Sequence, residues 1–329
     1  MRAPIVLLLA IAFPLVAALP AQAASVCAQR DEAAPALERL QHAMAEGRFV
    51  AYQPTALKVW DGNPVAAGEE SIRADLDALR PWFDGLVTYG AHSGAEKVPA
   101  IAAELGFRAV IVGVWDPSDE TELAAALAAW ETYPEIVVGL SLGNEVVFGQ
   151  RGDWAALESA IAHVRARAPG LPLSVTEPFA EFLTPAARPL LAGLDFMAVN
   201  IHPVFEPWFA EAPPFNWADF VVQVSRRLAD EAFCGPILVK ETGVPTGPAE
   251  KGFDEAKQAA FYGELQKVLP PSRARAFAFF SAFDAPWRVY DFNPVPGEHP
   301  EEAHWGLFTE TRAPKRVMDD LTPISAPAP

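Results

Sequence analysis

The stretch Gly139-Leu-Ser-Leu-Gly-Asn-Glu-Val-Val147 begins as an apolar run typical of a buried β-strand and stops at Asn144 and Glu145. A second stretch, Pro236-Ile-Leu-Val-Lys-Glu-Thr-Gly243, has the same shape and ends in Glu241. A carboxylate at the end of a buried strand is costly, so both glutamates need a functional reason. In a fold of parallel strands, both would lie at the carboxyl ends, where active sites are found.

On both sides of these stretches, strand-like and helix-like runs alternate along the chain. Eight strands are expected, at residues 49–54, 83–90, 108–115, 139–145, 173–177, 194–202, 236–241 and 275–283. The helices expected after them cover residues 68–79, 93–105, 116–130, 153–167, 181–191, 216–232, 254–268 and 313–321. Strands that are apolar on both faces favour a closed barrel, so we predict an α/β fold, a single-domain (β/α)8 TIM barrel with an N-terminal helical extension. The runner-up is a doubly wound sheet, but no Gly-x-Gly-x-x-Gly follows the first strand to support a dinucleotide site.

The chain opens on a segment typical of an export signal. Arg2 supplies a positive start, residues 5–19 are apolar, and Ala21-Gln-Ala23 has the small residues of a cleavage site. We therefore predict a signal peptide over residues 1–23 that is cleaved after Ala23, with an uncleaved anchor as the alternative. The mature protein is then exported, either periplasmic or secreted, and is not attached to a membrane.

Residues 24–48 form an N-terminal extension ahead of the predicted barrel. Within it, residues 31–47 predict an amphipathic helix, which we expect to pack on the outside of the barrel. Its apolar positions are Ala34, Leu37, Leu40 and Met44. The barrel itself is expected to span residues 49–322, and the Pro/Ala-rich tail, residues 323–329, to be frayed.

The net charge and the cysteine content limit which partners and ligands the protein is expected to bind. The formal net charge of the 329-residue chain is −17, which argues against nucleic acid and fits a neutral substrate. The two cysteines, Cys27 and Cys234, either form a disulfide that ties the extension to the barrel or remain as two buried thiols. Without a nearby histidine cluster they are poor material for a zinc site. The oligomeric state is not determined by these features.

Polar and aromatic side chains close almost every predicted strand. Aromatic rings stack on the apolar C–H faces of sugars, and an amide such as that of Asn144 can hold a sugar 2-hydroxyl. For the aromatic residues the alternative is core packing, which we prefer outright for Trp305; for His202 it is a structural histidine, and for Asp284 a capping carboxylate. The candidate substrate-binding residues are Tyr52, Tyr89, Asn144, Glu177, His202, Trp208, Asp284 and Trp287.

Glu145 and Glu241 are the candidate catalytic residues. The fourth and seventh strands face each other across an eight-stranded barrel, which can place two carboxyl groups ~5 Å apart, the separation of a retaining glycosidase. One carboxylate would attack the anomeric carbon while the other protonates the leaving oxygen. On an ideal strand Lys240 points away from Glu241, so we expect a supporting or outward-facing charge there.

The motifs resemble those of bacterial members of glycoside hydrolase family 17, the β-1,3-glucanases and β-1,3-glucanosyltransferases. Gly143-Asn-Glu-Val146 resembles the acid/base motif of that family and Glu241-Thr-Gly-Val-Pro245 its nucleophile motif. Further landmarks are Thr88-Tyr-Gly90, Thr176-Glu-Pro178, Asn200-Ile-His-Pro203, Ala282-Phe-Asp-Ala-Pro-Trp287 and His304-Trp-Gly-Leu-Phe308. The resemblance implies a retaining enzyme acting on β-1,3-linked glucan without a cofactor, with Glu145 as acid/base and Glu241 as nucleophile. The chain departs from the family pattern at Val244, where Trp is usual, and at Ala285 and Arg288.

Three functions remain open after this comparison of motifs. The first is an exported retaining β-1,3-glucan hydrolase, and the second a β-glucanosyltransferase using the same two glutamates. The third is a non-catalytic glucan-binding barrel. A separate class, a structural or assembly protein of the cell envelope, is suggested only by the export signal and the Pro/Ala-rich tail. A metal-dependent hydrolase is disfavoured because the six histidines show no ligand spacing such as His-x-x-x-His.

Overall fold

The structure is a computed structural model that describes residues 24–60, 63–290 and 297–324. The expected signal peptide and residues 325–329 of the expected tail lie outside these ranges. Among the described residues, no helix has both the length and the apolar character needed to cross a membrane.

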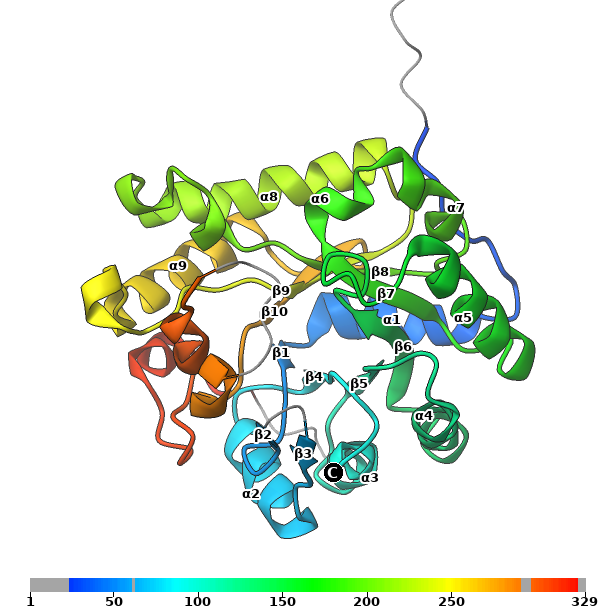
Figure 1. Cartoon of the computed structure of the whole chain (residues 1–329), viewed down its shortest axis with the longest axis horizontal. Coiled ribbons are helices and arrows are strands. Elements are labelled where there is room, and N and C mark those ends of the chain that lie inside the picture. Colours follow the sequence, from blue (N-terminus) through cyan, green and yellow to red (C-terminus); the bar gives the residue numbers. More distant parts are fainter. Residues whose placement is uncertain (1–23, 61–62, 291–296, 325–329) are drawn as a thin grey trace, which may run out of the picture.

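Eight parallel strands close into a barrel, which confirms the predicted fold and excludes the doubly wound sheet. Around the barrel they follow the order β1-β10-β9-β8-β7-β6-β5-β4 (Figure 1). Closure is direct, because Phe49 of β1 pairs with Ala278 of β10 on one side and with Gly85 of β4 on the other. The strands are β1 (Phe49–Ala51), β4 (Gly85–Val87), β5 (Ala109–Val114), β6 (Val137–Asn144), β7 (Leu173–Pro178), β8 (Met197–Asn200), β9 (Ile237–Glu241) and β10 (Arg275–Phe279).

Helices surround the strands (Figure 1). They are α2 (Glu69–Leu79), α3 (Val98–Glu104), α4 (Glu120–Thr132), α5 (Trp154–Arg167), α6 (Phe179–Phe182), α7 (Arg188–Leu191), α8 (Pro214–Glu231) and α9 (Glu255–Val268). Three of them start at an aspartate that accepts hydrogen bonds from first-turn N–H groups, namely Asp119, Asp153 and Asp254. The last expected helix, at residues 313–321, is instead the short 3-10 helix η8 (Arg316–Asp320).

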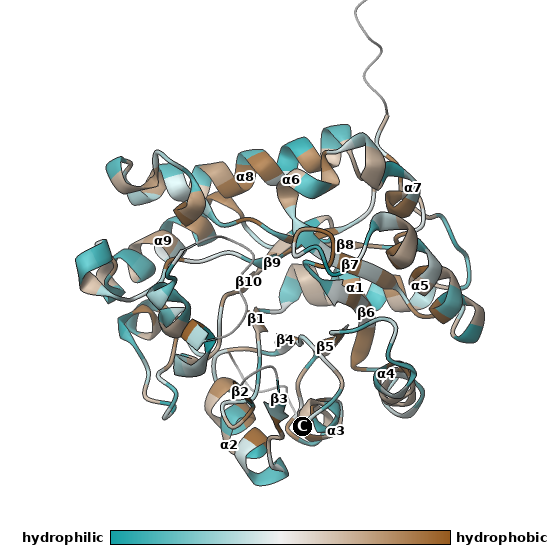
Figure 2. Cartoon of the chain, in the orientation of Figure 1, coloured by the Kyte–Doolittle hydropathy of each residue, from teal (hydrophilic) through white to brown (hydrophobic). Residues whose placement is uncertain are grey.

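The core has two layers, because side chains alternate between the two faces of each strand. Val50, Leu86 and Val110 face outward and pack against the helices. Phe49, Val87 and the other inward residues fill the barrel interior. The helices show the complementary pattern: α8 alternates hydrophobic and hydrophilic residues along its length (Figure 2).

Helix α1 (Ala34–Glu46) covers the end of the barrel at which the strands begin. Our expectation that it packs on the outside of the barrel was wrong. Leu40, Ala43 and Met44 belong to the same buried cluster as the barrel-interior residues. Two residues after Gly47 the chain enters β1, so α1 lies at the amino-terminal end of the strands. An open barrel end exposes apolar side chains, and an amphipathic helix laid across it buries them.

A short antiparallel hairpin, absent from the sequence-based prediction, leaves the barrel between β1 and α2. It consists of β2 (Lys58–Trp60) and β3 (Asn63–Val65). Strands of three residues leave too little alternation to be recognised from their pattern. The hairpin lies against the 3-10 helix η6 (Pro286–Tyr290), which follows β10.

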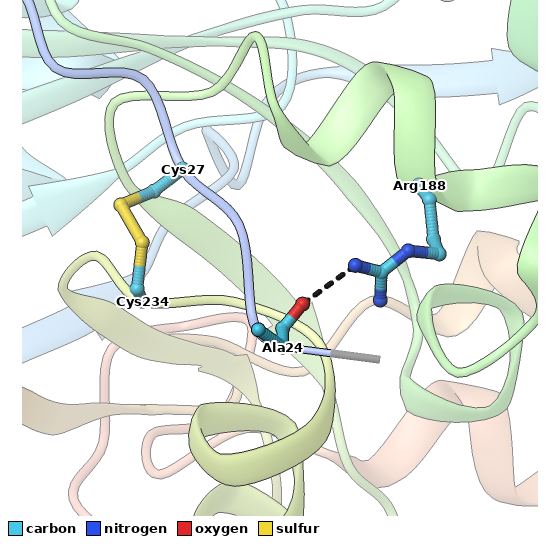
Figure 3. The surroundings of a disulfide bond; sticks show 4 residues. All are labelled: Ala24, Cys27, Arg188 and Cys234. Atoms are coloured by element: carbon cyan, nitrogen blue, oxygen red, sulfur yellow. Dashed lines mark hydrogen bonds between the residues drawn. A yellow bond between two sulfur atoms is a disulfide. The ribbon is translucent and has the colours of Figure 1, made fainter. Parts of the chain in front are cut away.

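Cys27 and Cys234 form a disulfide, with Cα atoms 5.4 Å apart (Figure 3). The bond joins the N-terminal extension to the turn between α8 and β9. The same attachment is reinforced by the Val26 N–H, which donates to the Ala232 carbonyl (3.0 Å), and by Arg188, which donates to the Ala24 carbonyl (2.5 Å). Of the two possibilities that the sequence left open, the structure selects the disulfide.

Candidate active site

Glu145 directly follows β6, and Glu241 ends β9, so both lie at the carboxyl ends of barrel strands. The backbone turns sharply at this end of β6, where φ is +78° at Gly143 and +53° at Glu145. Glycine adopts this left-handed region freely, but a glutamate there is strained, and such residues concentrate at functional sites. The Glu145 N–H donates to the carbonyl of Thr176 (2.8 Å), which holds the turn against β7.

The end of β8 supplies one polar group to each glutamate. Asn200 Nδ2 donates to Glu145 Oε1 (2.8 Å), and His202 Nε2 lies 3.5 Å from Glu241 Oε2. Asn200 and His202 are two positions apart, which is the spacing of residues on one side of an extended chain. The two carboxyl groups are therefore held by neighbouring groups of a single segment.

The surroundings shift the pKa values of the two glutamates in opposite directions. Burial, and then the charge of Glu241, raise the pKa of Glu145, although the Asn200 hydrogen bond opposes them. Burial also acts to raise the pKa of Glu241, but the His202 hydrogen bond and the charges of Lys240 and Arg288 outweigh it and lower that pKa. One carboxyl is thus suited to hold a proton and the other to stay ionised, as an acid and a nucleophile require.

Lys240 lies inside this site, so of the two expectations, a supporting or an outward-facing charge, the outward-facing one is excluded. Its Nζ donates to Asn144 Oδ1 (2.6 Å) and lies 3.7 Å from Glu241 Oε1. The cause is an irregular register: Val199 pairs with Val239, but Asn200 pairs with Glu241, so Lys240 is skipped. The simple alternation of an ideal strand does not hold across such a bulge.

A small pocket, open to solvent, lies at the carboxyl ends of β1, β4 and β10. Tyr89 lines it, as do Asp284 and Trp287 after β10, so three predicted substrate-binding residues meet there. Gln53 and Arg288 line it too. Tyr89 and Arg288 connect the pocket to the two glutamates, because each interacts electrostatically with Glu241.

Several buried polar atoms around the pair lack a hydrogen-bond partner among the described residues. Such atoms are rare in folded proteins and each calls for an explanation. Here they cluster where a hydroxyl-rich ligand could supply the missing partners. They include Tyr89 Oη, Asn200 Oδ1, His202 Nδ1, Glu241 Oε1 and Trp305 Nε1.

Tyr52 does not lie where it could contact a ligand, and this prediction is corrected. Ala51 faces the barrel interior, so the next residue faces the helices. The Tyr52 side chain has no exposed surface, and its hydroxyl donates to Asp75 Oδ2 of α2 (2.9 Å). Tyr52 is therefore a core residue behind β1.

Glu177 also has no exposed surface and serves the loop after Glu145 instead of a ligand. Its carboxylate accepts hydrogen bonds from the N–H groups of Val147 (2.8 Å) and Phe148 (3.1 Å). Burial raises the pKa of Glu177 to about 7 despite these hydrogen bonds. The strand-end rule located an important carboxylate but assigned it the wrong task.

The side chains of two further residues predicted to bind substrate make contacts within the protein. Trp208 is half-buried and packs edge-to-face on Phe220 of α8, with ring centroids 5.3 Å apart. Asp284 lines the pocket, but its Oδ1 accepts hydrogen bonds from Lys315 Nζ (2.6 Å) and from the Gly306 N–H (2.9 Å). The capping alternative for Asp284 thus describes at least part of its role.

Sequence reasoning did not select three residues that shape the site. Asn200 shares a two-residue spacing with His202, a signal that could have found it. Arg288 was noted only as a departure from the family pattern, and no sequence signal pointed to its interaction with Glu241. Trp305 is buried, as the packing alternative expected, but its ring lies 5.1 Å from that of His202 and so supports the partner of Glu241. Among the described residues, no group of three His, Cys, Asp or Glu side chains could hold a metal ion.

Comparison with known proteins adds independent information. Residues 50–306 match the model of the BtgE/BtgC glycoside hydrolase domain. A glucan 1,3-β-glucosidase of Arthroderma benhamiae is 27% identical over 268 residues, which cover 76% of this chain and 85% of that protein.

Two solved structures from Rhizomucor miehei share the fold. The first, a glycoside hydrolase family 17 β-1,3-glucanosyltransferase, has a TM-score of 0.60 at 21% identity and covers 82% of this chain and 95% of its own. The second is an active-site mutant β-1,3-glucanosyltransferase in complex with laminaritriose, with a TM-score of 0.61 at 19% identity over 82% and 96% of the two chains.

Proposed function

The chain belongs to the BtgE/BtgC glycoside hydrolase domain family, and from this premise we propose that it cleaves β-1,3-linked glucan with retention of configuration. Glu241 acts as the nucleophile and Glu145 as the acid/base. The observation that carries this assignment is the pair of buried carboxyl groups at one barrel rim whose pKa values are shifted in opposite directions.

The reaction proceeds in two balanced steps. The Glu241 carboxylate attacks the anomeric carbon while the glycosidic oxygen leaves with the proton of Glu145, which forms a glycosyl ester on Glu241. Water then gives a proton to Glu145 and its oxygen attacks the same carbon, which releases the sugar and restores the Glu241 carboxylate. As the Glu241 charge is lost in the first step, the pKa of Glu145 falls, which suits its change from acid to base.

The substrate proposal draws on the relatives and the pocket. The relatives are named for activities on 1,3-β-glucan, and one related structure holds laminaritriose. The pocket presents Tyr89 and Trp287 together with polar groups, a lining that suits a pyranose ring. Transfer to a second sugar instead of water uses the same two glutamates and remains the alternative.

We also propose that the protein works outside the cytoplasm. The Cys27–Cys234 disulfide supports this, because such bonds persist in oxidising compartments. The predicted signal peptide agrees with it, and cell fractionation followed by N-terminal sequencing would test both.

The proposed function is tested by incubating the purified chain with laminarihexaose and resolving the products by mass. Shorter products indicate hydrolysis, and products longer than the substrate indicate transfer. Glu241→Ala is expected to abolish turnover. Glu145→Gln should lose about 10²–10⁴-fold in kcat/KM on this substrate but far less in kcat/KM on 2,4-dinitrophenyl β-glucoside, whose leaving group needs no acid.

Two results would contradict the proposal. Wild-type protein that leaves every β-glucan unchanged while still binding it would favour the non-catalytic barrel. Equal losses of kcat/KM for Glu145→Gln on both substrates would remove Glu145 from the role of acid.

A further inference from the structure

Lys240 is a fully buried lysine beside the candidate nucleophile, and only 1% of its side chain is exposed. A buried ammonium group is costly unless charged or polar partners compensate it. Burial lowers the pKa of Lys240 to about 8, while the charges of Glu241 and Glu145 act to raise it, so the ammonium form prevails below that pH. The chain thus has a buried cation at a position where an apolar side chain would avoid the free-energy cost of desolvating a charge.

Three contacts surround the Lys240 ammonium. Nζ donates to Asn144 Oδ1 at 2.6 Å, lies 3.7 Å from Glu241 Oε1, and stands 4.2 Å from the centroid of the Tyr89 ring. The ammonium therefore has an amide oxygen, a carboxylate and an aromatic face as neighbours, all from different strand ends. These contacts satisfy the cation and, in return, restrict each partner.

The contact with Asn144 sets which end of the amide remains available. An ammonium has only donors, so it selects Oδ1 of Asn144 and not the NH₂ group. The backbone carbonyl of Asn144 is held separately, because the Arg151 side chain donates a hydrogen bond to it (2.5 Å). Among the described residues no acceptor takes a hydrogen bond from Nδ2, so its two N–H donors are left for a ligand hydroxyl.

The contact with Glu241 is electrostatic. Glu241 also faces His202, which follows β8, and Arg288 from η6. The carboxyl of Glu145, which follows β6, is its acidic neighbour. Among the cations, Lys240 is held in place by burial and by two further contacts, whereas Arg288 also pairs with Glu302 (3.0 Å). The position of Lys240 depends on the bulge that lets Glu241 pair with Asn200.

We propose that Lys240 is a positioning residue of the glycosidase site, which orients the Asn144 amide toward the sugar and keeps Glu241 in its nucleophilic, ionised form. The role rests on the proposed function of Glu241. Under this proposal the residue directly before the nucleophile belongs to the active site, although the alternation of an ideal strand would point its side chain away from Glu241.

Two substitutions separate the two parts of this role. Lys240→Met keeps most of the side-chain volume but removes the charge and the donor. Lys240→Gln removes the charge but keeps a donor for Asn144. We expect both variants to raise the Glu241 pKa by about one to three units, because an adjacent cation lowers a carboxyl pKa by that amount.

Activity should follow the ionisation of Glu241. On 2,4-dinitrophenyl β-glucoside, which needs no acid in the first step, the acid limb of kcat/KM should move to higher pH by the same amount in both variants. On laminarihexaose, Lys240→Met should lose more activity than Lys240→Gln, because only the glutamine can still hold Asn144. In the Asn144→Ala background this difference between the two variants should disappear.

Lys315→Met is the matched control. Lys315 is also a buried lysine with a carboxylate partner, since its Nζ lies 2.6 Å from Asp284 Oδ1. Removing it deletes a comparable buried cation without touching Glu241. The Glu241 pKa should therefore remain at the wild-type value in Lys315→Met.

The decisive measurement is a ¹³C NMR titration of protein labelled at the glutamate side-chain carboxyl, with Glu241→Gln used to assign the signal. This titration needs no substrate, so it also reports on a protein that fails to turn over. Glu241 pKa values that are equal in wild type, Lys240→Met and Lys240→Gln would overturn the proposal about Lys240. Absence of turnover on any β-glucan, with the titration still shifted, would overturn the proposed function and leave the electrostatic assignment of Lys240 standing.

Discussion

At the scale of single residues, burial and local charges decide what each carboxyl group of the rim can do. Glu145, Glu177 and Glu241 all lie at strand ends, yet only Glu241 has a lowered pKa, because His202, Lys240 and Arg288 act on it together. Glu177 has the hydrogen bonds of two backbone N–H groups but no such cation, and its pKa is about 7.

Glu177 makes stability depend on pH in a direction that can be worked out. Its pKa is about 7 in the folded chain and about 4.3 in an unfolded one, so the folded state binds more protons between these values. The stabilising contribution is full below about pH 4.3 and is lost as pH rises through about 7. Relative to Glu177→Gln, wild type should lose on the order of 3–4 kcal/mol of unfolding free energy across this window.

This difference is measured by urea unfolding of both proteins at several pH values. Glu131→Gln, the same substitution at an exposed position of α4, is the control and should show no such window. Parallel pH curves for wild type and Glu177→Gln would contradict the raised pKa of Glu177.

At the scale of elements, the barrel separates stability from chemistry by its two ends. Helix α1 closes the amino-terminal end, and the polar residues of the site gather at the carboxyl ends of the strands. This division is general for the fold, in which the two ends of the strands carry different tasks.

Shortening a plug residue of α1 should therefore cost stability but not catalysis. Leu40 is fully buried, so Leu40→Ala should destabilise the chain by about 2–5 kcal/mol through lost burial and a cavity. Leu37→Ala is the matched control. Leu37 is only partly buried beside the same cluster, so this substitution should lower the free energy of unfolding by less. Denaturant unfolding measures both changes, and an altered kcat/KM in folded Leu40→Ala would show that the two ends are coupled.

At the scale of the whole molecule, the disulfide links segments 207 residues apart in sequence. A cross-link that closes so long a loop restricts the unfolded chain strongly, by roughly 5 kcal/mol in the chain-entropy view. In the folded state the extension has other attachments, including the ion pair between Arg30 and Asp195 (2.5 Å).

Removing the disulfide should consequently lower stability and leave the site intact. The double variant Cys27→Ser with Cys234→Ser should unfold at lower temperature and lower denaturant concentration than wild type, with a loss of about 2–5 kcal/mol. Dithiothreitol should destabilise wild type but not the double variant, which serves as the control. An unchanged midpoint for wild type under reducing conditions would mean that the bond adds no stability.

The sequence by itself indicated the architecture and the two glutamates at one barrel rim. Runs apolar on both faces, repeated eight times, favour a parallel barrel with helices around it, and this pattern is local. An apolar run that ends in Glu, as at Glu145 and Glu241, marks a carboxyl strand end, and all such ends meet at one rim. Tyr89, Trp287 and Asp284 were located at the pocket by the same rule.

Only the tertiary structure decided which way several of these side chains face and what they contact. Tyr52 turns to Asp75 because Ala51 takes the inward position, and Lys240 enters the site through a register shift against β8. The Glu177 carboxylate accepts hydrogen bonds from the loop that follows Glu145. Helix α1 packs across the amino-terminal end of the barrel. Periodicity encodes how much of a segment is buried, whereas register, bulges and the partner across a buried interface arise from contacts between segments far apart in the chain.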